Sequence, residues 1–273
     1  MIMSECSGKN FILNGELVPA VKFNNSLVFE GDSLYEVIRI VNGKPLFFHD
    51  HMERLANSAR LKGKDLLAGE PELREVVQLL INSEKKTDTN LKVVFNYSTT
   101  RNCLVYLLES QYPTRDQYQS GVKGILYYAE RKDPGSKVIN QNLRTAIAEK
   151  LIEEGAYEAL LVNGNNEITE GSRSNIFFLK NDKLITAPDN SVLCGITRKH
   201  ILDICREINL TVKFECVRDE EIGEYDGVFM TGTSPIVLPF FCIGENRFNV
   251  NHQLTEKLRQ LYLEKADASI LLF

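Results

Sequence analysis

Two kinds of hydrophobic pattern alternate along this chain of 273 residues, and together they restrict it to folds that mix strands with helices. Residues 35–41 are rich in β-branched and aromatic side chains, and the Asn42-Gly43 turn after them favours a hairpin whose second strand covers residues 45–48. Further on, four apolar residues recur at the spacing of one helix face, behind a proline suited to a first helical turn: Leu73, Val76, Val77 and Leu80.

The same two patterns place further elements along the chain. Strands are predicted at residues 91–97, 103–108, 122–129, 157–162, 175–179, 183–186 and 227–230. Helices are predicted at residues 51–61 and around three apolar stripes that begin at Leu143, Ile201 and Leu254. The mixture of elements indicates an α+β fold.

A polar stretch at residues 112–121, which contains Pro113 and Gly121, is the predicted linker between two domains. Residues 1–115 then form a smaller N-terminal α/β domain, and residues 116–273 form a larger C-terminal domain. The chain is long enough for two domains of ordinary size.

Composition argues against several classes of protein. The net charge is −5 and the basic residues are scattered, so nucleic acid is not an expected partner. The six cysteines stand far apart without a C-x-x-C pair, which disfavours a disulfide framework or a zinc site. Residues 1–10 are polar and include Glu5, and no run of about 20 apolar residues occurs, so we expect neither a signal peptide nor a membrane span. A cytoplasmic location is predicted.

Two short segments have the composition of anion sites. Gly195-Ile196-Thr197-Arg198 precedes the helix that carries Ile201, where free backbone N–H groups and a hydroxyl would face an anion. The segment Thr231-Gly232-Thr233-Ser234 follows a predicted strand and is a second cluster of glycine and hydroxyls. A capped helix start and a plain turn are the more frequent structures for these two patterns, although two such segments in one chain are more suggestive of a phosphate site than either alone.

One polar run and three single polar residues attract notice, although local pattern alone does not select them. His49-Asp50-His51 offers only two imidazoles and a carboxylate, which is too few ligands to favour a metal site. Arg54 in a predicted helix and Lys137 in a polar turn are ordinary surface residues by their local pattern, and Glu170 is by default a turn residue between strands.

At these positions the chain resembles the class IV aminotransferases, which are pyridoxal-phosphate enzymes of fold type IV. This family includes branched-chain aminotransferases, D-amino-acid transaminases and aminodeoxychorismate lyases. The resemblance extends from about Phe11 to Gly244. Seven segments match in family order: GDSLYEVIRI from Gly31, HMERLANSA from His51, KVIN from Lys137, YEALLV from Tyr157, ITEGSRSNIF from Ile168, GITR from Gly195 and MTGTS from Met230.

The resemblance implies a two-domain fold like that of D-amino-acid aminotransferase, with pyridoxal 5'-phosphate as cofactor. It makes Lys137 the catalytic residue, which forms the Schiff base with the cofactor and moves a proton between substrate and cofactor. Glu170 matches the carboxylate that pairs with the pyridine nitrogen, and Tyr35 falls near the substrate carboxylate. Because the family's active site borders a dimer interface, a homodimer is implied.

The other cofactor-binding positions that the resemblance implies either bind the cofactor phosphate or line the pocket for its ring. Arg54 would bind the cofactor phosphate with a planar guanidinium. The remaining residues would complete the phosphate site or line the ring: Ile196, Thr197, Gly232 and Thr233 at the phosphate, Leu193 against the ring, and Ser174 and Asn175 along the pocket.

The signals of substrate class conflict. The Arg-x-His pair of D-amino-acid enzymes is missing before Gln111, and Asn142 stands where branched-chain enzymes usually have tyrosine. Pro235 resembles the lyases, whereas Glu36 and the Glu170-Gly171-Ser172 segment have the transaminase form. The favoured hypothesis is transfer of an amino group between an amino acid and a 2-oxo acid. The alternatives are a lyase that releases pyruvate and a relative without catalysis that only binds a ligand.

Overall fold

The computed structural model describes residues 4–131 and 133–273, so the first three residues of the polar N-terminal stretch lie outside the described part. The contacts divide the chain into two compact units. Unit 1 comprises the described residues up to Gln111 together with Ser136–Ile139 and Ala266–Phe273. Unit 2 comprises Tyr112–Gly135 and Asn140–Lys265.

The assignment of two short segments differs from the expected division at residues 115 and 116. We expected Ser136–Ile139 and Ala266–Phe273 in the C-terminal domain, and both belong to unit 1. The first of them carries Lys137 and bonds to a strand of unit 1 at the lysine and two residues after it: the backbone N–H of Tyr35 donates to the carbonyl of Lys137 at 3.2 Å, and the backbone N–H of Ile139 donates to that of Ser33 at 3.2 Å.

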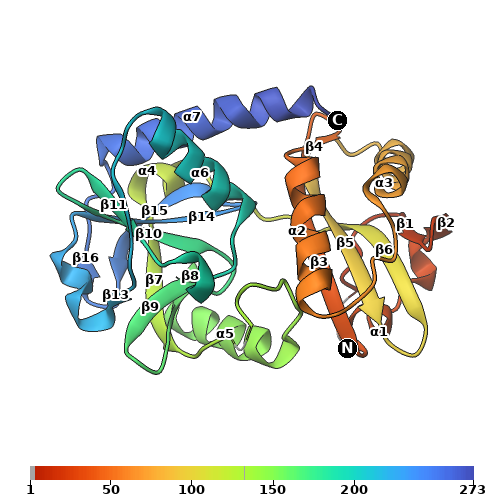
Figure 1. The fold of residues 1–273 in the computed structure, drawn as a ribbon, viewed down its shortest axis with the longest axis horizontal. Helices are drawn as coiled ribbons and strands as arrows, with labels where there is room; N and C mark the ends of the chain where they lie inside the picture. Colours follow the sequence, from red (N-terminus) through yellow and green to blue (C-terminus); the bar gives the residue numbers. More distant parts are fainter. Residues whose placement is uncertain (1–3, 132) are drawn as a thin grey trace. The chain divides into compact units, whose positions relative to one another are not determined.

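Unit 1 is built around a six-stranded antiparallel sheet in the order β2-β1-β6-β5-β3-β4 (Figure 1). The strands are β1 (Asn10–Leu13), β2 (Glu16–Pro19), β3 (Asp32–Val41), β4 (Lys44–Pro45), β5 (Thr89–Tyr97) and β6 (Arg101–Leu108). The predicted strands at 35–41, 91–97 and 103–108 are confirmed and are each slightly longer. The predicted return strand at 45–48 was wrong beyond Pro45, because Phe47 takes a left-handed conformation with φ 50° and ends the pairing.

The helices of unit 1 are η1 (Ala20–Lys22), α1 (Ser26–Phe29), α2 (Phe48–Leu61) and α3 (Glu70–Glu84). In α3 the Glu72 carboxylate accepts from the backbone N–H of Gly69 at 2.9 Å, which caps the helix start ahead of the predicted apolar stripe. The helices bury this stripe and Met52, Leu55 and Ala59 of α2 against one face of the sheet.

The last residues of the chain complete the core of unit 1. The ring of Phe273 meets that of Phe48 with 5.0 Å between centroids, and the Arg74 guanidinium lies 4.8 Å from the Phe273 ring centroid. Nearby, the Ser269 hydroxyl accepts from the backbone N–H of Phe47 at 3.2 Å. The first turn of α2 is therefore supported by residues more than 200 positions later in the sequence.

Unit 2 contains a ten-stranded mixed sheet in the order β12-β11-β10-β14-β15-β7-β8-β9-β13, with β16 paired to β15. Its strands are β7 (Val122–Tyr128), β8 (Glu158–Val162), β9 (Glu167–Gly171), β10 (Asn175–Lys180), β11 (Lys183–Thr186), β12 (Val212–Phe214), β13 (Val217–Arg218), β14 (Gly227–Gly232), β15 (Ile236–Ile243) and β16 (Asn246–Arg247). The default placement of Glu170 in a turn was wrong, because this residue lies in β9, which pairs with β8 and β13.

The remaining helices are α4 (Arg115–Ser120), α5 (Gln141–Glu154), α6 (Ile196–Glu207) and α7 (Gln253–Ile270), with the 3-10 turns η2 (Asp189–Ser191) and η3 (Asp219–Glu224). The predicted linker at 112–121 is partly helical, because Thr114 and Gln117 form a capping box that starts α4. In α5 the Asn140 side chain accepts from the Leu143 N–H at 3.2 Å.

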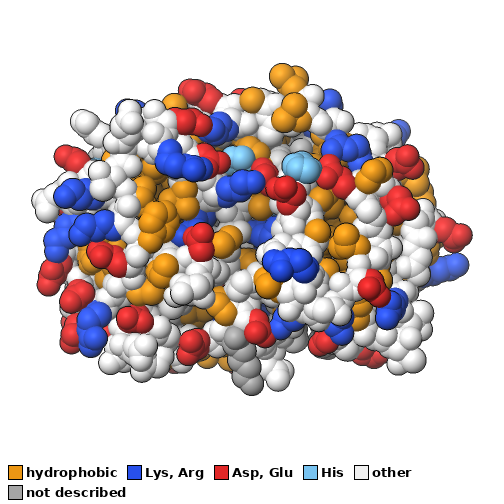
Figure 2. Space-filling model, viewed as in Figure 1, with side chains coloured by type: hydrophobic (Ala, Val, Ile, Leu, Met, Phe, Trp, Pro, Cys, Tyr) orange, Lys and Arg blue, Asp and Glu red, His pale blue; other side chains and the backbone are white. Residues whose placement is uncertain are grey.

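The described residues include no helix that is long and apolar enough to cross a membrane. On the face drawn in Figure 2, acidic and basic side chains are interspersed rather than gathered by sign.

We predict that Gly121→Ala is more destabilising than Gly155→Ala. Both glycines of unit 2 have positive φ, +74° and +57°, so alanine is strained at either site by about 1–2 kcal/mol. At Gly121 an added Cβ would also lie 2.7 Å from Val250 Cγ1 and 2.8 Å from the Phe241 nitrogen, whereas at Gly155 it meets nothing within 4 Å. Overpacking adds about 1–3 kcal/mol at the first site alone. Urea unfolding of both variants measures the difference, and equal costs would contradict the steric argument.

Candidate functional site

The backbone around Lys137 is fixed by unit 1. In addition to the two hydrogen bonds with β3, the Lys137 N–H donates to the Ser58 hydroxyl of α2 at 3.3 Å. Leu34 and Val138 form a β-bridge between the same strand and this segment. Lys137 is thus held at a defined position although no helix or long strand contains it.

The side chain of Lys137 meets the ring of Tyr35. The lysine Nζ lies 5.3 Å from the ring centroid, within the range of a cation–π contact. Tyr35 is buried, at 9% exposure. The residue expected near the substrate and the expected catalytic lysine are therefore neighbours within one unit.

Close enough to Lys137 to interact with its charge lies a buried cluster of three charged or titratable side chains, which we call the Glu36 cluster: Glu36, His51 and Arg54. The Arg54 guanidinium donates from Nε to Glu36 Oε1 at 2.8 Å and from Nη2 to Glu36 Oε2 at 2.6 Å. His51 Nδ1 lies 2.7 Å from Glu36 Oε2. All three side chains are at least nine-tenths buried, and that of Glu36 has no exposed area.

The Glu36 cluster follows from the periods of its two elements. On β3, Glu36 is separated by two or four positions from Leu34, Ile38 and Ile40. It therefore lies on the same face of the strand as these residues, which is the core face of the sheet. On α2, His51, Arg54 and Ser58 are spaced three and four residues apart and share one face. The α2 face therefore brings a guanidinium and an imidazole to the single carboxylate on the facing strand.

The environment sets the charges of the cluster. Burial raises the pKa of Glu36, but the charges of Arg54 and Lys137 and the hydrogen bonds from Arg54 and His51 outweigh it and hold that pKa well below its usual range. Burial lowers the pKa of His51 by more than its hydrogen bond with Glu36 raises it. Near neutral pH Glu36 is thus ionised, and a neutral His51 donates its Nδ1 proton to it.

In unit 2, Glu170 is the centre of a second set of contacts. The residue is buried, Arg131 Nη1 donates to its Oε1 at 3.2 Å, and the backbone N–H of Leu193 donates to its Oε2 at 3.1 Å. The Leu193 carbonyl in turn accepts from Asn175 Nδ2 at 2.8 Å. These bonds connect β9 and β10 to the loop before α6.

The start of α6 adjoins Asn175. A Cβ on Gly195, the residue before the helix, would lie 2.2 Å from Asn175 Oδ1, so only glycine fits there. Ile196 and Thr197 follow as the first buried residues of α6. Ser174, next to Asn175, donates to the buried carboxylate of Glu158 at 2.8 Å.

The second glycine segment lies beside the same strand. In the pairing of β10 with β14, Asn175 faces Thr231, and Gly232 and Thr233 come next in the chain. The Thr231 hydroxyl oxygen is buried and has no hydrogen-bond partner among the described residues. Buried hydroxyls usually have a hydrogen-bond partner, so a hydroxyl that has none among the described residues is available to accept or donate a bond to a bound molecule.

The structure therefore gathers the predicted residues in two groups, each within one unit. Tyr35, Arg54 and Lys137 form the first, and Glu170, Ser174, Asn175, Leu193, Ile196, Thr197, Gly232 and Thr233 form the second. Local pattern missed the roles of Glu36, His51 and Arg131 in holding them. An acidic residue at a core position of an apolar strand, as at Glu36, was the one signal available in the sequence.

The two histidines of the His49-Asp50-His51 run have separate partners. His49 Nδ1 lies 2.8 Å from Glu70 Oε2 at the surface, whereas His51 bonds to Glu36 in the interior. Within residues 4–131 and 133–273, no three or more His, Cys, Asp or Glu side chains are placed to hold a metal ion.

Comparison with known proteins identifies the family. The model of the family "Amino-transferase class IV" matches residues 33–240, which is most of the chain. D-alanine aminotransferase of Bacillus licheniformis is 32% identical over 222 residues, which cover 77% of this chain and 78% of that protein. The chain belongs to the class IV aminotransferase family and is an enzyme, as the resemblance in its motifs predicted.

Solved structures agree on the fold. Branched-chain amino acid aminotransferase of Escherichia coli superimposes with a TM-score of 0.84 at 20% identity and covers 94% of both chains. A putative 4-amino-4-deoxychorismate lyase of Legionella pneumophila superimposes with a TM-score of 0.77 at 25% identity, over 87% of this chain and 92% of that one. The predicted α+β fold of the class IV enzymes is confirmed, and the structure has one sheet in each unit.

The opposite pKa shifts of the two histidines on α2 predict opposite effects on stability. The pKa of His51 is lowered in the folded state, so the stability it supports is complete above the ordinary value of about 6.5 and falls as the pH drops below it. Hydrogen bonding and the charge of Glu70 raise the pKa of His49, so its contribution is present below about 6.5 and is lost as the pH rises through the folded pKa.

We therefore expect His51→Gln to flatten the decline in unfolding free energy between about pH 7 and 5, and His49→Gln to steepen it. Urea titrations of wild type and both variants across this range measure the slopes. Three parallel profiles would show that neither imidazole titrates as its contacts require.

Proposed function

We propose that this enzyme is a pyridoxal-phosphate-dependent aminotransferase that moves an amino group between an amino acid and a 2-oxo acid, with Lys137 as the residue that binds the cofactor covalently. The observation that carries the proposal is the position of Lys137. Its backbone is bonded to β3 and α2, and its Nζ lies against Tyr35 and near the buried Glu36 cluster. A surface lysine in a polar turn needs no such support.

The donors present suit a phosphorylated, aromatic cofactor. In unit 1 the planar cation of Arg54 would bind phosphate oxygens, with its orientation held by Glu36. In unit 2 the N-terminal N–H groups of α6 at Ile196 and Thr197 would donate to the phosphate. The unpartnered Thr231 hydroxyl beside Gly232 and Thr233 supports an anion site at this strand end.

The remaining residues would hold the ring. The Glu170 carboxylate, positioned by Arg131 and the Leu193 N–H, would accept a hydrogen bond from the pyridine nitrogen. Leu193 would pack on the ring, while Ser174 and Asn175 would line the pocket. When bound, pyridoxal phosphate supplies an electron-withdrawing ring that stabilises negative charge at the substrate Cα. Lys137 Nζ would take the proton from the substrate Cα and return it at the cofactor C4′ carbon.

Two observations favour transamination. The relative with 32% identity is named as a D-alanine aminotransferase. The Glu170-Gly171-Ser172 segment, which has the transaminase form, is also built into the fold, because Ser172 Oγ donates to the buried Glu158 carboxylate at 2.5 Å. The similarity to a putative 4-amino-4-deoxychorismate lyase keeps elimination of pyruvate as the second candidate. A cytoplasmic location and a homodimer stay predictions from the sequence.

We expect purified wild-type protein to show a visible absorption band with pyridoxal phosphate that borohydride reduction traps, because the cofactor carbonyl condenses with Lys137 Nζ. Lys137→Ala should lack both the band and the covalent adduct. The matched control Lys150→Ala removes a half-exposed lysine ion-paired with Glu153 and Glu154, and it should retain the wild-type spectrum. Mass spectrometry of the reduced protein identifies the modified residue. An adduct that persists in Lys137→Ala would overturn the assignment and favour the non-catalytic alternative.

Product analysis separates the two reactions. Incubation of the holoenzyme with amino acids of both stereochemical series and a 2-oxo acid should yield a new amino acid, which chromatography detects. Incubation with aminodeoxychorismate should yield no pyruvate and no 4-aminobenzoate. Release of those two products, without transamination of any amino acid, would assign the protein to the lyases.

A further inference from the structure

The turn between β14 and β15 in unit 2 is tightly constrained. The two strands pair as far as Gly232 opposite Ile236, so residues 233–235 alone connect them. Pro235 packs against Gly232, because a Cβ added to the glycine would lie 3.3 Å from Pro235 Cγ and 3.4 Å from Pro235 Cδ. Just before the turn lies Thr231, whose buried hydroxyl has no hydrogen-bond partner among the described residues. The turn therefore belongs to the strand end at which we place the cofactor phosphate.

The backbone is strained where the chain leaves this turn. Ile236 has a φ of 57°, which lies in the left-handed region that β-branched residues rarely adopt. A strained residue of this kind persists only where its surroundings fix the backbone. A flip of the peptide between Pro235 and Ile236 would return Ile236 to negative φ, and it would also redirect the Pro235 carbonyl and the Ile236 N–H. The observed turn therefore requires a contact that holds this peptide.

Tyr118 of α4 supplies such a contact. Its hydroxyl donates to the Pro235 carbonyl at 3.1 Å, and this carbonyl belongs to the peptide that precedes Ile236. The guanidinium carbon of Arg259, on α7, lies 4.9 Å from the centroid of the Tyr118 ring, within the range of a cation–π contact. Tyr118 is thus oriented by one helix and fixes a peptide of the turn.

We propose that Tyr118 is a positioning residue for the cofactor phosphate. By holding the Pro235–Ile236 peptide against a flip, its hydroxyl keeps the turn and the end of β14 at Thr231 in the arrangement that binds phosphate oxygens. A turn that is fixed in advance binds an anion more tightly, because it loses no further conformational freedom on binding. This inference rests on the proposed function, which places the phosphate at this strand end.

The first test compares two cofactor forms on the full chain. Tyr118→Phe removes only the hydroxyl and leaves the ring beside Arg259. It should raise the dissociation constant of pyridoxal phosphate about three- to tenfold, the loss expected for one hydrogen bond. The dissociation constant of pyridoxal, which has the same ring without the phosphate, should stay at the wild-type value. An equal rise for both ligands, or a rise for neither, would overturn the proposal.

The matched control is Tyr97→Phe in unit 1. The Tyr97 hydroxyl also donates to a backbone carbonyl, that of Asp65 at 2.7 Å, and Lys64 Nζ lies 5.3 Å from the centroid of its ring. The control therefore removes the same kind of bond from a tyrosine beside a cation, away from the turn. Both dissociation constants should equal those of wild type. A rise for pyridoxal phosphate as large as in Tyr118→Phe would attribute the effect to general destabilisation and would overturn the proposal.

A second variant tests whether Tyr118 acts through the strained residue. Asparagine adopts positive φ more readily than isoleucine, so Ile236→Asn should keep the turn without help from Tyr118. In this background, adding Tyr118→Phe should change the dissociation constant of pyridoxal phosphate by less than about twofold. An undiminished rise would show that the hydroxyl does not act by holding the peptide before residue 236, which contradicts the proposal.

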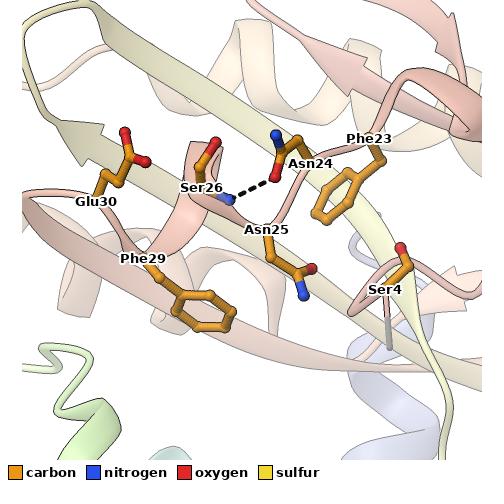
Figure 3. Close-up of a pocket in the computed structure, with 7 residues that line it drawn as sticks. All are labelled: Ser4, Phe23, Asn24, Asn25, Ser26, Phe29 and Glu30. Carbon is orange, nitrogen blue, oxygen red and sulfur yellow. Dashed lines mark hydrogen bonds between the residues drawn. The ribbon is translucent and has the colours of Figure 1, made fainter. Parts of the chain in front are cut away.

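Inorganic phosphate serves as a probe that is independent of the chemistry at Lys137. It should raise the thermal unfolding midpoint of the cofactor-free wild type and of Tyr97→Phe equally, and that of Tyr118→Phe by less. An open hollow of about 540 Å³ in unit 1 is no competing site for this anion, because its lining includes the Glu30 carboxylate and no basic side chain (Figure 3).

The two measurements separate this inference from the proposed function. If no adduct forms at Lys137 but phosphate distinguishes Tyr118→Phe from wild type, the role of Tyr118 stands and the proposed function fails. If the adduct forms at Lys137 but neither phosphate nor pyridoxal phosphate distinguishes the variant, the role of Tyr118 fails alone.

Discussion

The paired charges of Glu36 and Arg54 are the interaction on which the rest of unit 1 depends. A carboxylate without solvent contact is stable only with a guanidinium bonded to both oxygens, and that pair joins β3 to α2. Lys137 is in turn bonded to the same strand and helix, through Tyr35 and Ser58. Removal of one partner would leave a buried charge and would also release the two elements that fix the lysine. The pair therefore fixes the positions of both elements, because loss of either partner leaves an uncompensated buried charge.

Unit 2 holds its functional residues by a different means. Glu170, Leu193, Asn175 and Gly195 are joined by single hydrogen bonds and one close steric fit, through backbone groups of a loop rather than through an ion pair between two regular elements. These contacts orient the Glu170 carboxylate and the backbone N–H groups at the start of α6. It tolerates little change in side-chain volume, because Gly195 leaves room only for the Asn175 oxygen.

The sequence predicted most of the regular elements, because their hydrophobic periods are clear, as in the stripe of α3 from Leu73 onward. Prediction failed where the local residue types are unusual for the element that the folded chain forms. Pro235 and Pro239 concealed β15, and the polar β9 around Glu170 was taken for a turn. The site was within reach only by resemblance, since nothing in the local patterns shows that distant residues bury Arg54 and fix the backbone of Lys137. Partner choice, such as Glu5 for Lys92, depends on contacts 87 residues apart, which periodicity does not encode.

The completion of unit 1 by residues 266–273 has a consequence for biosynthesis. A ribosome releases these residues after the whole of unit 2, yet Ser269 and Phe273 support the first turn of α2, the helix that carries Arg54. Cotranslational folding of the first 111 residues therefore yields a sheet whose covering helix still lacks its final contacts. The helix that carries Arg54 therefore lacks these contacts in a nascent chain until residues 266–273 have emerged from the ribosome.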